Sequence, residues 1–223
     1  MTFDPTADWL AWQVVDSAFP TGVFAHSWGL EAAWQQGDVP NLTALQRFLA
    51  ASVQQTAFGA LPLLNAAYRQ PNRWLALDEL ADAFLTNPVA NRASRVQGRA
   101  LLSTAGRVWP SDEVAVLAEE ADRGCAHVAP LSGVVFQLIG LPIETARTAM
   151  LFGTARGVLS AAVRLGIIGS YDAQRMHHDA GRDLEQLLAR CNTLAAEDVC
   201  QTAPVLDILH AGHDRLYSRL FQS

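Results

Sequence analysis

Hydrophobic residues recur along this chain with the 3.6-residue period of an α-helix, and stretches of clean alternation are scarce. Proline and glycine separate the periodic segments, and no low-complexity stretch marks a linker. The pattern therefore predicts an all-α fold, a single compact, bundle-like domain of roughly ten helices. Helices are expected near residues 9–16, 26–36, 43–61, 62–70, 77–85, 88–107, after 111, at 129–140, 142–166, 170–191 and 204–221.

Two of the predicted helices have a distinctive surface. The segment 129–140 is apolar on nearly every side, so we expect a fully buried helix. In the helix after residue 142, Ala149, Gly153, Gly157 and Ala161 recur every four residues. Such a stripe of small side chains lets a neighbouring backbone approach closely, and we interpret it as tight helix packing.

The composition is apolar for a soluble protein. Of the 223 residues, 50% are hydrophobic and 17% are charged, against a typical charged share of about 25%. This surplus fits either a large core with a sparsely charged surface or a face that only a partner covers. The net charge of −6 argues against binding to nucleic acid, whose phosphates require a basic surface.

Several classes of chemistry are excluded or disfavoured. All sixteen basic residues are arginine, and a chain without lysine cannot be a P-loop nucleotide hydrolase or form a pyridoxal Schiff base. The three cysteines lack CxxC spacing and predict neither a disulfide framework nor a zinc site. Adjacent His26 and Ser27 point in different directions on a helix and GxSxG is absent, so no catalytic residue is predicted. Without a signal-peptide pattern or an apolar run of roughly 18 residues, we expect a cytoplasmic protein that does not contact membranes.

Two pairs of histidines are the candidates for a metal site. His210 and His213 are three residues apart on one helical face and could reach the same ion. His177 and His178 form the second pair. A tight structural site needs four ligands, which the spacing does not supply, so a solvated histidine face is the alternative.

Two regions are candidates for binding other proteins. Arg92, Arg95 and Arg99 share one face of the helix at 88–107, either as a solvated face or as a partner-binding patch. The segment 215–223 is rich in large side chains, whereas chain ends are normally polar and frayed. It therefore docks either on its own domain or on a partner. Its candidate contact residues are Tyr217, Ser218, Arg219, Leu220 and Phe221.

Five segments along nearly the whole chain carry recognisable motifs: 16–31 (DSAFPTGVFAHSWGLE), 91–102 (NRASRVQGRALL), 151–166, 203–209 and 215–221. In this order they resemble urease accessory protein F, the UreF family. The first resembles the N-terminal signature of the family, the second its central motif, and the others its C-terminal half. Phe19, Val23 and Trp28 stand where a leucine, a second glycine and a small residue are common in the family.

The resemblance implies a non-enzymatic, cytoplasmic helical protein that forms a homodimer. Members bridge UreD (also called UreH) and the GTPase UreG, and this assembly delivers nickel to urease apoenzyme, so no tightly bound cofactor is expected. By position, residues 217–221 would dock on UreD/UreH, with Pro20, His26, Ser27 and Glu31 near the same surface. One of the three arginines would then be a candidate arginine finger toward UreG. The alternative is a metallochaperone that binds nickel directly through its surface histidines.

Overall fold

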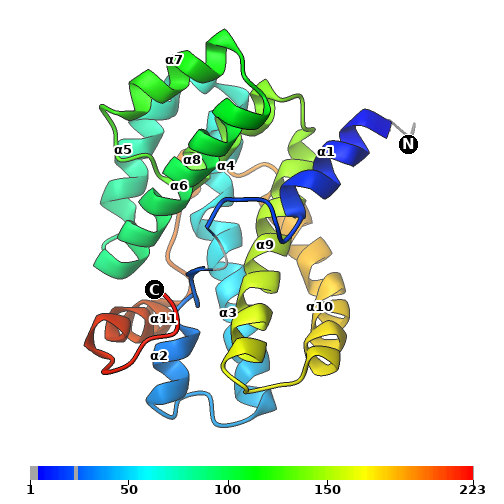
Figure 1. Cartoon of the computed structure of the whole chain (residues 1–223), viewed down its shortest axis with the longest axis vertical. Coiled ribbons are helices and arrows are strands. Elements are labelled where there is room, and N and C mark those ends of the chain that lie inside the picture. The colour runs from blue at the N-terminus through cyan, green and yellow to red at the C-terminus, as the bar shows by residue number, and fades with distance from the viewer. Residues whose placement is uncertain (1–4, 23–24, 223) are drawn as a thin grey trace.

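The structure is a computed structural model that describes residues 5–22 and 25–222. These residues form α-helices joined by short turns and short 3₁₀ helices, with no strand among them (Figure 1). The predicted all-α fold is confirmed. The α-helices are α1 Pro5–Val15, α2 Leu30–Gln35, α3 Leu42–Gly59, α4 Leu61–Arg69, α5 Trp74–Phe84, α6 Pro88–Val108, α7 Asp112–Ala121, α8 Val128–Leu138, α9 Ile143–Arg164, α10 Ser170–Cys191 and α11 Pro204–Ala211. The 3₁₀ helices are η2 Pro71–Arg73, η3 Ala196–Asp198 and η4 Gly212–Arg215.

Side-chain caps and prolines set several of the helix boundaries. Asn41 Oδ1 accepts a hydrogen bond from Ala44 N at 3.0 Å at the start of α3. Ser111 Oγ does the same for Val114 N at 3.2 Å at the start of α7. Both side chains satisfy backbone donors that a helix N-terminus otherwise leaves unpaired. Pro62 lies in the first turn of α4, where its missing N–H costs no hydrogen bond, and the preceding helix ends before it.

Helix α8 lies at the centre of one half of the molecule, between α4 and α6 (Figure 1). The prediction of a fully buried helix at 129–140 holds for residues 129–136, which are all buried, whereas Gln137 is exposed and the helix ends at Leu138. A Cβ atom at Gly133 would lie only 2.5 Å from the carbonyl oxygen of Leu64 in α4. Glycine is therefore required here, because the backbones of α4 and α8 pack directly against each other.

The stripe of small residues on α9 receives a side chain along part of its length. A Cβ atom at Gly157 would lie 2.5 Å from Trp28 Nε1. At Gly153, by contrast, an added Cβ would meet nothing within 4 Å. The prediction of tight helix packing along the whole stripe is therefore wrong at these two positions. The space that Gly157 leaves explains how the chain accommodates a large indole in the turn before α2.

Several helix boundaries differ from the prediction, and two of them, at α2 and α11, concern the two ends of the chain. The helix expected at 26–36 begins only at Leu30, because Trp28 (φ 60°) and Gly29 (φ 83°) adopt left-handed backbone conformations that interrupt a right-handed helix. The helix expected at 204–221 ends at Ala211, and after η4 the chain continues without regular structure. Val23 and Ser223 lie outside the described residues.

The core is a cluster of buried hydrophobic side chains that runs from α2 to α10 and includes Phe221 near the C-terminus. Within the described ranges, no helix combines the length and the hydropathy that a bilayer crossing requires. Helix α8 is highly apolar, but it has only 11 residues, whereas a membrane-spanning helix needs about 20.

Candidate partner-binding site

The C-terminal segment, residues 212–222, turns back after α11 and lies against α2 (Figure 1). Gln222 N donates a hydrogen bond to the carbonyl oxygen of Ala25 at 2.7 Å. Gln35 Nε2 donates to the carbonyl oxygen of Ser218 at 3.2 Å. The structure therefore joins the predicted turn near residues 20–31 and the predicted docking segment into one site.

The carboxylate of Glu31, near the start of α2, holds the C-terminal segment in place. Its Oε1 accepts a hydrogen bond from Leu220 N at 2.6 Å, and its Oε2 accepts one from Phe221 N at 3.1 Å. Nε2 of His213 lies 3.3 Å from the same Oε2. Glu31 is 1% exposed and His213 is fully buried. Hydrogen bonds to an ionised acceptor contribute about 1.5–3 kcal/mol each, so this arrangement, the Glu31 clamp, is a strong local constraint.

The side chains of the C-terminal segment divide into an inward and an outward set. Phe221 is 6% exposed, and the guanidinium of Arg164 lies 4.2 Å from the centre of its ring. Tyr217 is fully exposed, and Leu220 is about half exposed. Docking on its own domain therefore holds for Phe221, and the predicted partner contact through its ring is wrong in this structure, because the chain's own core covers it. Tyr217, Leu220 and the exposed Arg219 remain available to a partner.

The turn residues that were predicted to face a partner differ in their exposure to solvent. Pro20 is exposed, and its carbonyl oxygen accepts a hydrogen bond from Thr104 Oγ1 of α6 at 3.0 Å. His26, Ser27 and Glu31 are buried. These three side chains therefore do not contact a partner directly in this conformation. They support the exposed residues of the surface from the interior.

Burial lowers the pKa values of His26 and His210. Burial, reinforced by the charges of His213 and Arg92, lowers the pKa of His26 to about 4. Burial also lowers the pKa of His210 to about 4, and the charges of His213, His26 and Arg92 lower it further.

The turn before α2 packs closely against α11. A Cβ atom at Gly29 would lie 3.1 Å from the Cα atom of His210. Glycine at this left-handed position therefore allows α11 to pack directly on the turn.

Neither predicted histidine pair belongs to a cluster of three candidate metal ligands among the described residues. Nε2 of His210 is buried and without a hydrogen-bond partner, and Nε2 of His213 faces the clamp carboxylate. His177 is partly buried and packs edge-on against an aromatic ring, while neighbouring His178 is exposed. The description of these residues as surface histidines is wrong for His213. Nickel binding by either pair stays a prediction.

Asp214 connects the predicted arginine patch to the C-terminal segment. Its Oδ1 lies 2.8 Å from Nη2 of Arg92 in α6 and 3.6 Å from Nη1 of Arg219. Arg95 and Arg99 line a shallow groove on α6 together with Arg92. Two regions that were predicted separately as partner-binding therefore meet on one side of the molecule.

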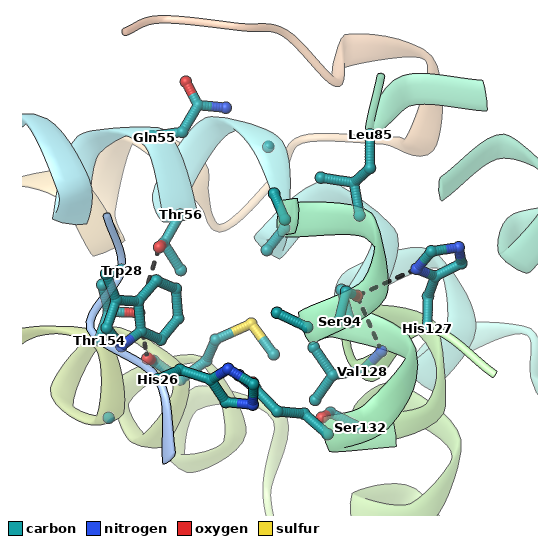
Figure 2. Close-up of a pocket in the computed structure, with 18 of the residues that line it drawn as sticks. His26, Trp28, Gln55, Thr56, Leu85, Ser94, His127, Val128, Ser132 and Thr154 are labelled. Carbon is teal, nitrogen blue, oxygen red and sulfur yellow. Dashed lines mark hydrogen bonds between the residues drawn. The ribbon is translucent and has the colours of Figure 1, made fainter. Parts of the chain in front are cut away.

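A cavity of about 260 Å³ lies beneath the turn and is lined mainly by apolar side chains. His26 and Trp28 lie on one side of it, and Ser94 and Val128 lie on the other (Figure 2). Some polar groups on its wall pair within the protein, such as Thr56 Oγ1 with a second threonine hydroxyl at 3.1 Å, whereas Trp28 Nε1 and His210 Nε2 have no hydrogen-bond partner. Because a void forfeits packing contacts, both the turn and the face of α8 that line it give up part of their packing.

Comparison with known proteins decides the family. The UreF family model matches residues 39–181. Urease accessory protein F of Arabidopsis thaliana is 39% identical over 221 residues, covering 96% of this chain and 92% of the relative. The protein of the same name from Oryza sativa subsp. indica is 37% identical over 219 residues (96% and 84%), and urease accessory protein UreF of Arthrobacter sp. strain FB24 is 31% identical over 214 residues (95% of each). The chain belongs to the UreF family of urease accessory proteins.

Both halves of the candidate site lie outside the segment that the UreF model matches. The turn near residues 20–31 precedes that segment and the C-terminal segment follows it. Residues 39–181 supply most of the helical core, including α8 and α9. The UreF model therefore describes the scaffold, and the two flanking regions together form the candidate binding surface on it.

Sequence reasoning placed Glu31 near this surface without its role as a clamp, and it did not assign Asp214 or Arg164 to the surface. Nothing in the sequence indicates the contacts of these two residues, since single charged residues are common on helix surfaces. For Glu31 a signal was present, because it stands between Leu30 and Ala32 in an apolar stretch. A carboxylate that folds into such a position needs internal donors, and here they are backbone amides 189 and 190 positions away.

Proposed function

We propose that this chain acts in urease maturation as a scaffold without catalytic activity of its own. It binds UreD/UreH and the GTPase UreG in the cytoplasm, and the assembled complex delivers nickel to urease apoenzyme. Membership of the UreF family supports the role in urease maturation. The absence of lysine supports assigning GTP hydrolysis to UreG, because this chain cannot provide the P-loop that GTP hydrolysis requires.

The observation that carries this proposal is the exposed apolar surface beside the Glu31 clamp. Tyr217 and Leu220 of the C-terminal segment and Val205 and Ile208 of the adjoining α11 are large hydrophobic side chains, and all are exposed. Exposed apolar side chains that gather in one region mark interaction sites. The clamp fixes the backbone of the segment in advance, which reduces the ordering cost that a partner must offset.

A double substitution, Tyr217→Ala with Leu220→Ala, tests this surface. It removes the outward side chains and keeps the buried Phe221, so the segment stays docked. Truncating an anchor at an interface costs about 2 kcal/mol or more, so we expect co-purified UreD/UreH to fall to less than about a tenth. Urease activation in cells should fall in parallel, and helical circular dichroism should not change.

Matched controls are available elsewhere on the surface. Tyr171 of α10 and Val116 of α7 are also exposed hydrophobic residues. The double variant Tyr171→Ala with Val116→Ala should co-purify UreD/UreH like the unmodified chain. Normal co-purification by the Tyr217 and Leu220 variant would refute the proposed docking surface.

Arg95 and Arg99 provide the proposed contact for UreG, because Arg92 is already paired with Asp214. Arg95→Ala with Arg99→Ala should reduce co-purification of UreG and leave that of UreD/UreH intact. If one of these arginines acts as a finger on the transferring phosphoryl group, GTP turnover by UreG should also fall. Unchanged UreG binding would remove the basis for this contact.

We also propose that the chain forms a homodimer. Trp9 and Trp12 of α1 are 74% and 72% exposed, and exposed tryptophans are frequent anchors of protein interfaces. Light scattering of the purified chain should give twice the mass of 24.1 kDa. Trp9→Ser with Trp12→Ser should shift the equilibrium toward the single chain, whereas a single-chain mass for the unmodified protein would contradict the proposal.

A further inference from the structure

One group of side chains outside the partner-binding site has the composition of a metal centre. Asp82 lies on α5, and Cys125 and His127 lie in the loop that precedes α8. A carboxylate oxygen, the sulfur and a ring nitrogen all lie within 4.8 Å of one another. No other group of three or more candidate ligands meets this criterion among residues 5–22 and 25–222. The proposed scaffold function assigns no role to these side chains, although Asp82 also lines the groove that contains Arg95 and Arg99.

The loop that carries two of the three side chains is held rigidly. The carboxylate of Asp78, one helical turn before Asp82, accepts hydrogen bonds from the backbone N–H groups of Cys125, Ala126 and His127 at 2.6, 3.0 and 2.7 Å. On the opposite side, a Cβ atom at Gly98 would lie 2.0 Å from the Ala126 carbonyl oxygen. Helices α5 and α6 therefore fix the loop from both sides, as a preorganised site requires.

The ring of His127 is oriented so that one nitrogen faces Asp82. The side chain is fully buried, and its Nδ1 lies 3.0 Å from Ser94 Oγ (Figure 2). Its Nε2 lies 3.1 Å from Asp82 Oδ1, which also accepts a hydrogen bond from Asn91 Nδ2 at 2.9 Å. Histidines that bind metals characteristically bond to a protein group through their second nitrogen. Ser94 and Asn91 are placed to serve as such supporting partners.

We propose that Asp82, Cys125 and His127 bind one divalent transition-metal ion. Ligand bonds of 2.0–2.1 Å at tetrahedral angles separate oxygen and nitrogen donors by about 3.3 Å, close to the observed 3.1 Å between Asp82 Oδ1 and His127 Nε2. Thiolate with imidazole selects zinc, cobalt or nickel over magnesium or calcium. Asp82 and Cys125 are partly exposed, so solvent or a fourth ligand can complete the coordination from outside.

The charges and protons of this site balance. Ionised Asp82 and Cys125 together neutralise a doubly charged ion, and the opposite charges of nearby Asp78 and Arg95 offset each other. On binding, the Cys125 thiol releases its proton to solvent. The ring proton of His127 takes the Nδ1 position, where it is donated to Ser94 Oγ, and the Nε2 lone pair coordinates the ion. No electron is transferred.

Cobalt(II), added to chain stripped with a chelator, is a suitable probe because cobalt–thiolate bonds absorb in the near ultraviolet. One equivalent should give a thiolate-to-cobalt charge-transfer band that zinc abolishes by displacement. Cys125→Ser should lose the band, while Cys200→Ser, which changes an exposed cysteine, should keep it. Asp82→Asn should weaken cobalt binding, which means that the dissociation constant rises by about tenfold or more. His210→Ala should leave it unchanged, which separates this site from the histidine pairs.

Three results would overturn the proposal. One is the absence of a charge-transfer band from the unmodified chain at one equivalent of cobalt. Another is an undiminished band in Cys125→Ser, which would assign the thiolate elsewhere. The third is an unchanged dissociation constant in Asp82→Asn, which would remove the carboxylate from the ligand set. Cys125 and Asp82 are partly exposed, so the two variants should fold, and circular dichroism checks this.

Discussion

Replacing Glu31 with glutamine tests whether the clamp holds the C-terminal segment. The amide keeps one acceptor oxygen, which can still serve Leu220 N, but its NH₂ group then faces Phe221 N and His213 Nε2. Two interactions with a charged acceptor are lost, and each contributes about 1.5–3 kcal/mol. Allowing for local relaxation, we expect the docked state of the segment to lose about 2–4 kcal/mol. That loss corresponds to roughly a 30-fold to 1,000-fold increase in the undocked population.

Hydrogen exchange of the amides of Leu220 and Phe221 measures this equilibrium directly, because both are donors to the clamp. Exchange at these amides should accelerate by the same factor, while amides of the buried α8 keep their protection. Gln35→Ala is the matched control, since it removes one exposed contact to the segment and should accelerate exchange by less than about tenfold. Equal exchange in Glu31→Gln and the unmodified chain would refute the assigned role of the carboxylate.

Three further predictions concern stability. Asp78→Ala leaves three backbone donors of the loop before α8 without an acceptor, so urea denaturation should show a loss of about 3 kcal/mol or more. Gly98→Ala places a Cβ 2.0 Å from a carbonyl oxygen and should cost about 1–3 kcal/mol, whereas Gly153→Ala, which meets nothing within 4 Å, should gain about 0.5–1 kcal/mol from helix propensity. The pKa values of His26 and His210 fall to about 4 in the folded state, while the unfolded chain takes up these protons near pH 6.5. Their contribution is therefore complete above pH 6.5 and is lost as the pH falls toward 4, by up to about 3 kcal/mol per histidine, which urea titrations across this range would check.

The helical architecture could be predicted because its signals are local. Caps such as Asn41 and Ser111, and prolines such as Pro62, act within one turn of the helix that they begin. The apolar sequence of α8 likewise predicts its burial without knowledge of its neighbours. Interactions between residues that are close in sequence can be inferred directly from the order of those residues.

The candidate site could be predicted only in part, because its contacts are long-range. The sequence indicated that the C-terminal segment and the turn matter, but helical periodicity extended the last helix to Phe221. The carboxylate of Glu31 overrides that propensity by capturing two amides of the segment. The left-handed backbone conformation of Trp28 could not be predicted either, because it depends on the space that Gly157 leaves for the indole ring. The cluster at Asp82 escaped a search for CxxC spacing because it contains a single cysteine and because Asp82 lies on α5, far in sequence from the loop that carries Cys125 and His127.

The Glu31 clamp has a consequence for the order of events during translation. It joins residues 189 positions apart, so the turn and α2 leave the ribosome long before their backbone donors have been synthesised. Until residues 220–222 emerge, the carboxylate must stay hydrated, and α2 cannot settle into its final position. The surface formed by Tyr217 and Leu220 therefore appears only after the helical core is in place. A nascent or prematurely terminated chain would lack it, which would delay assembly with partners until synthesis has passed this point.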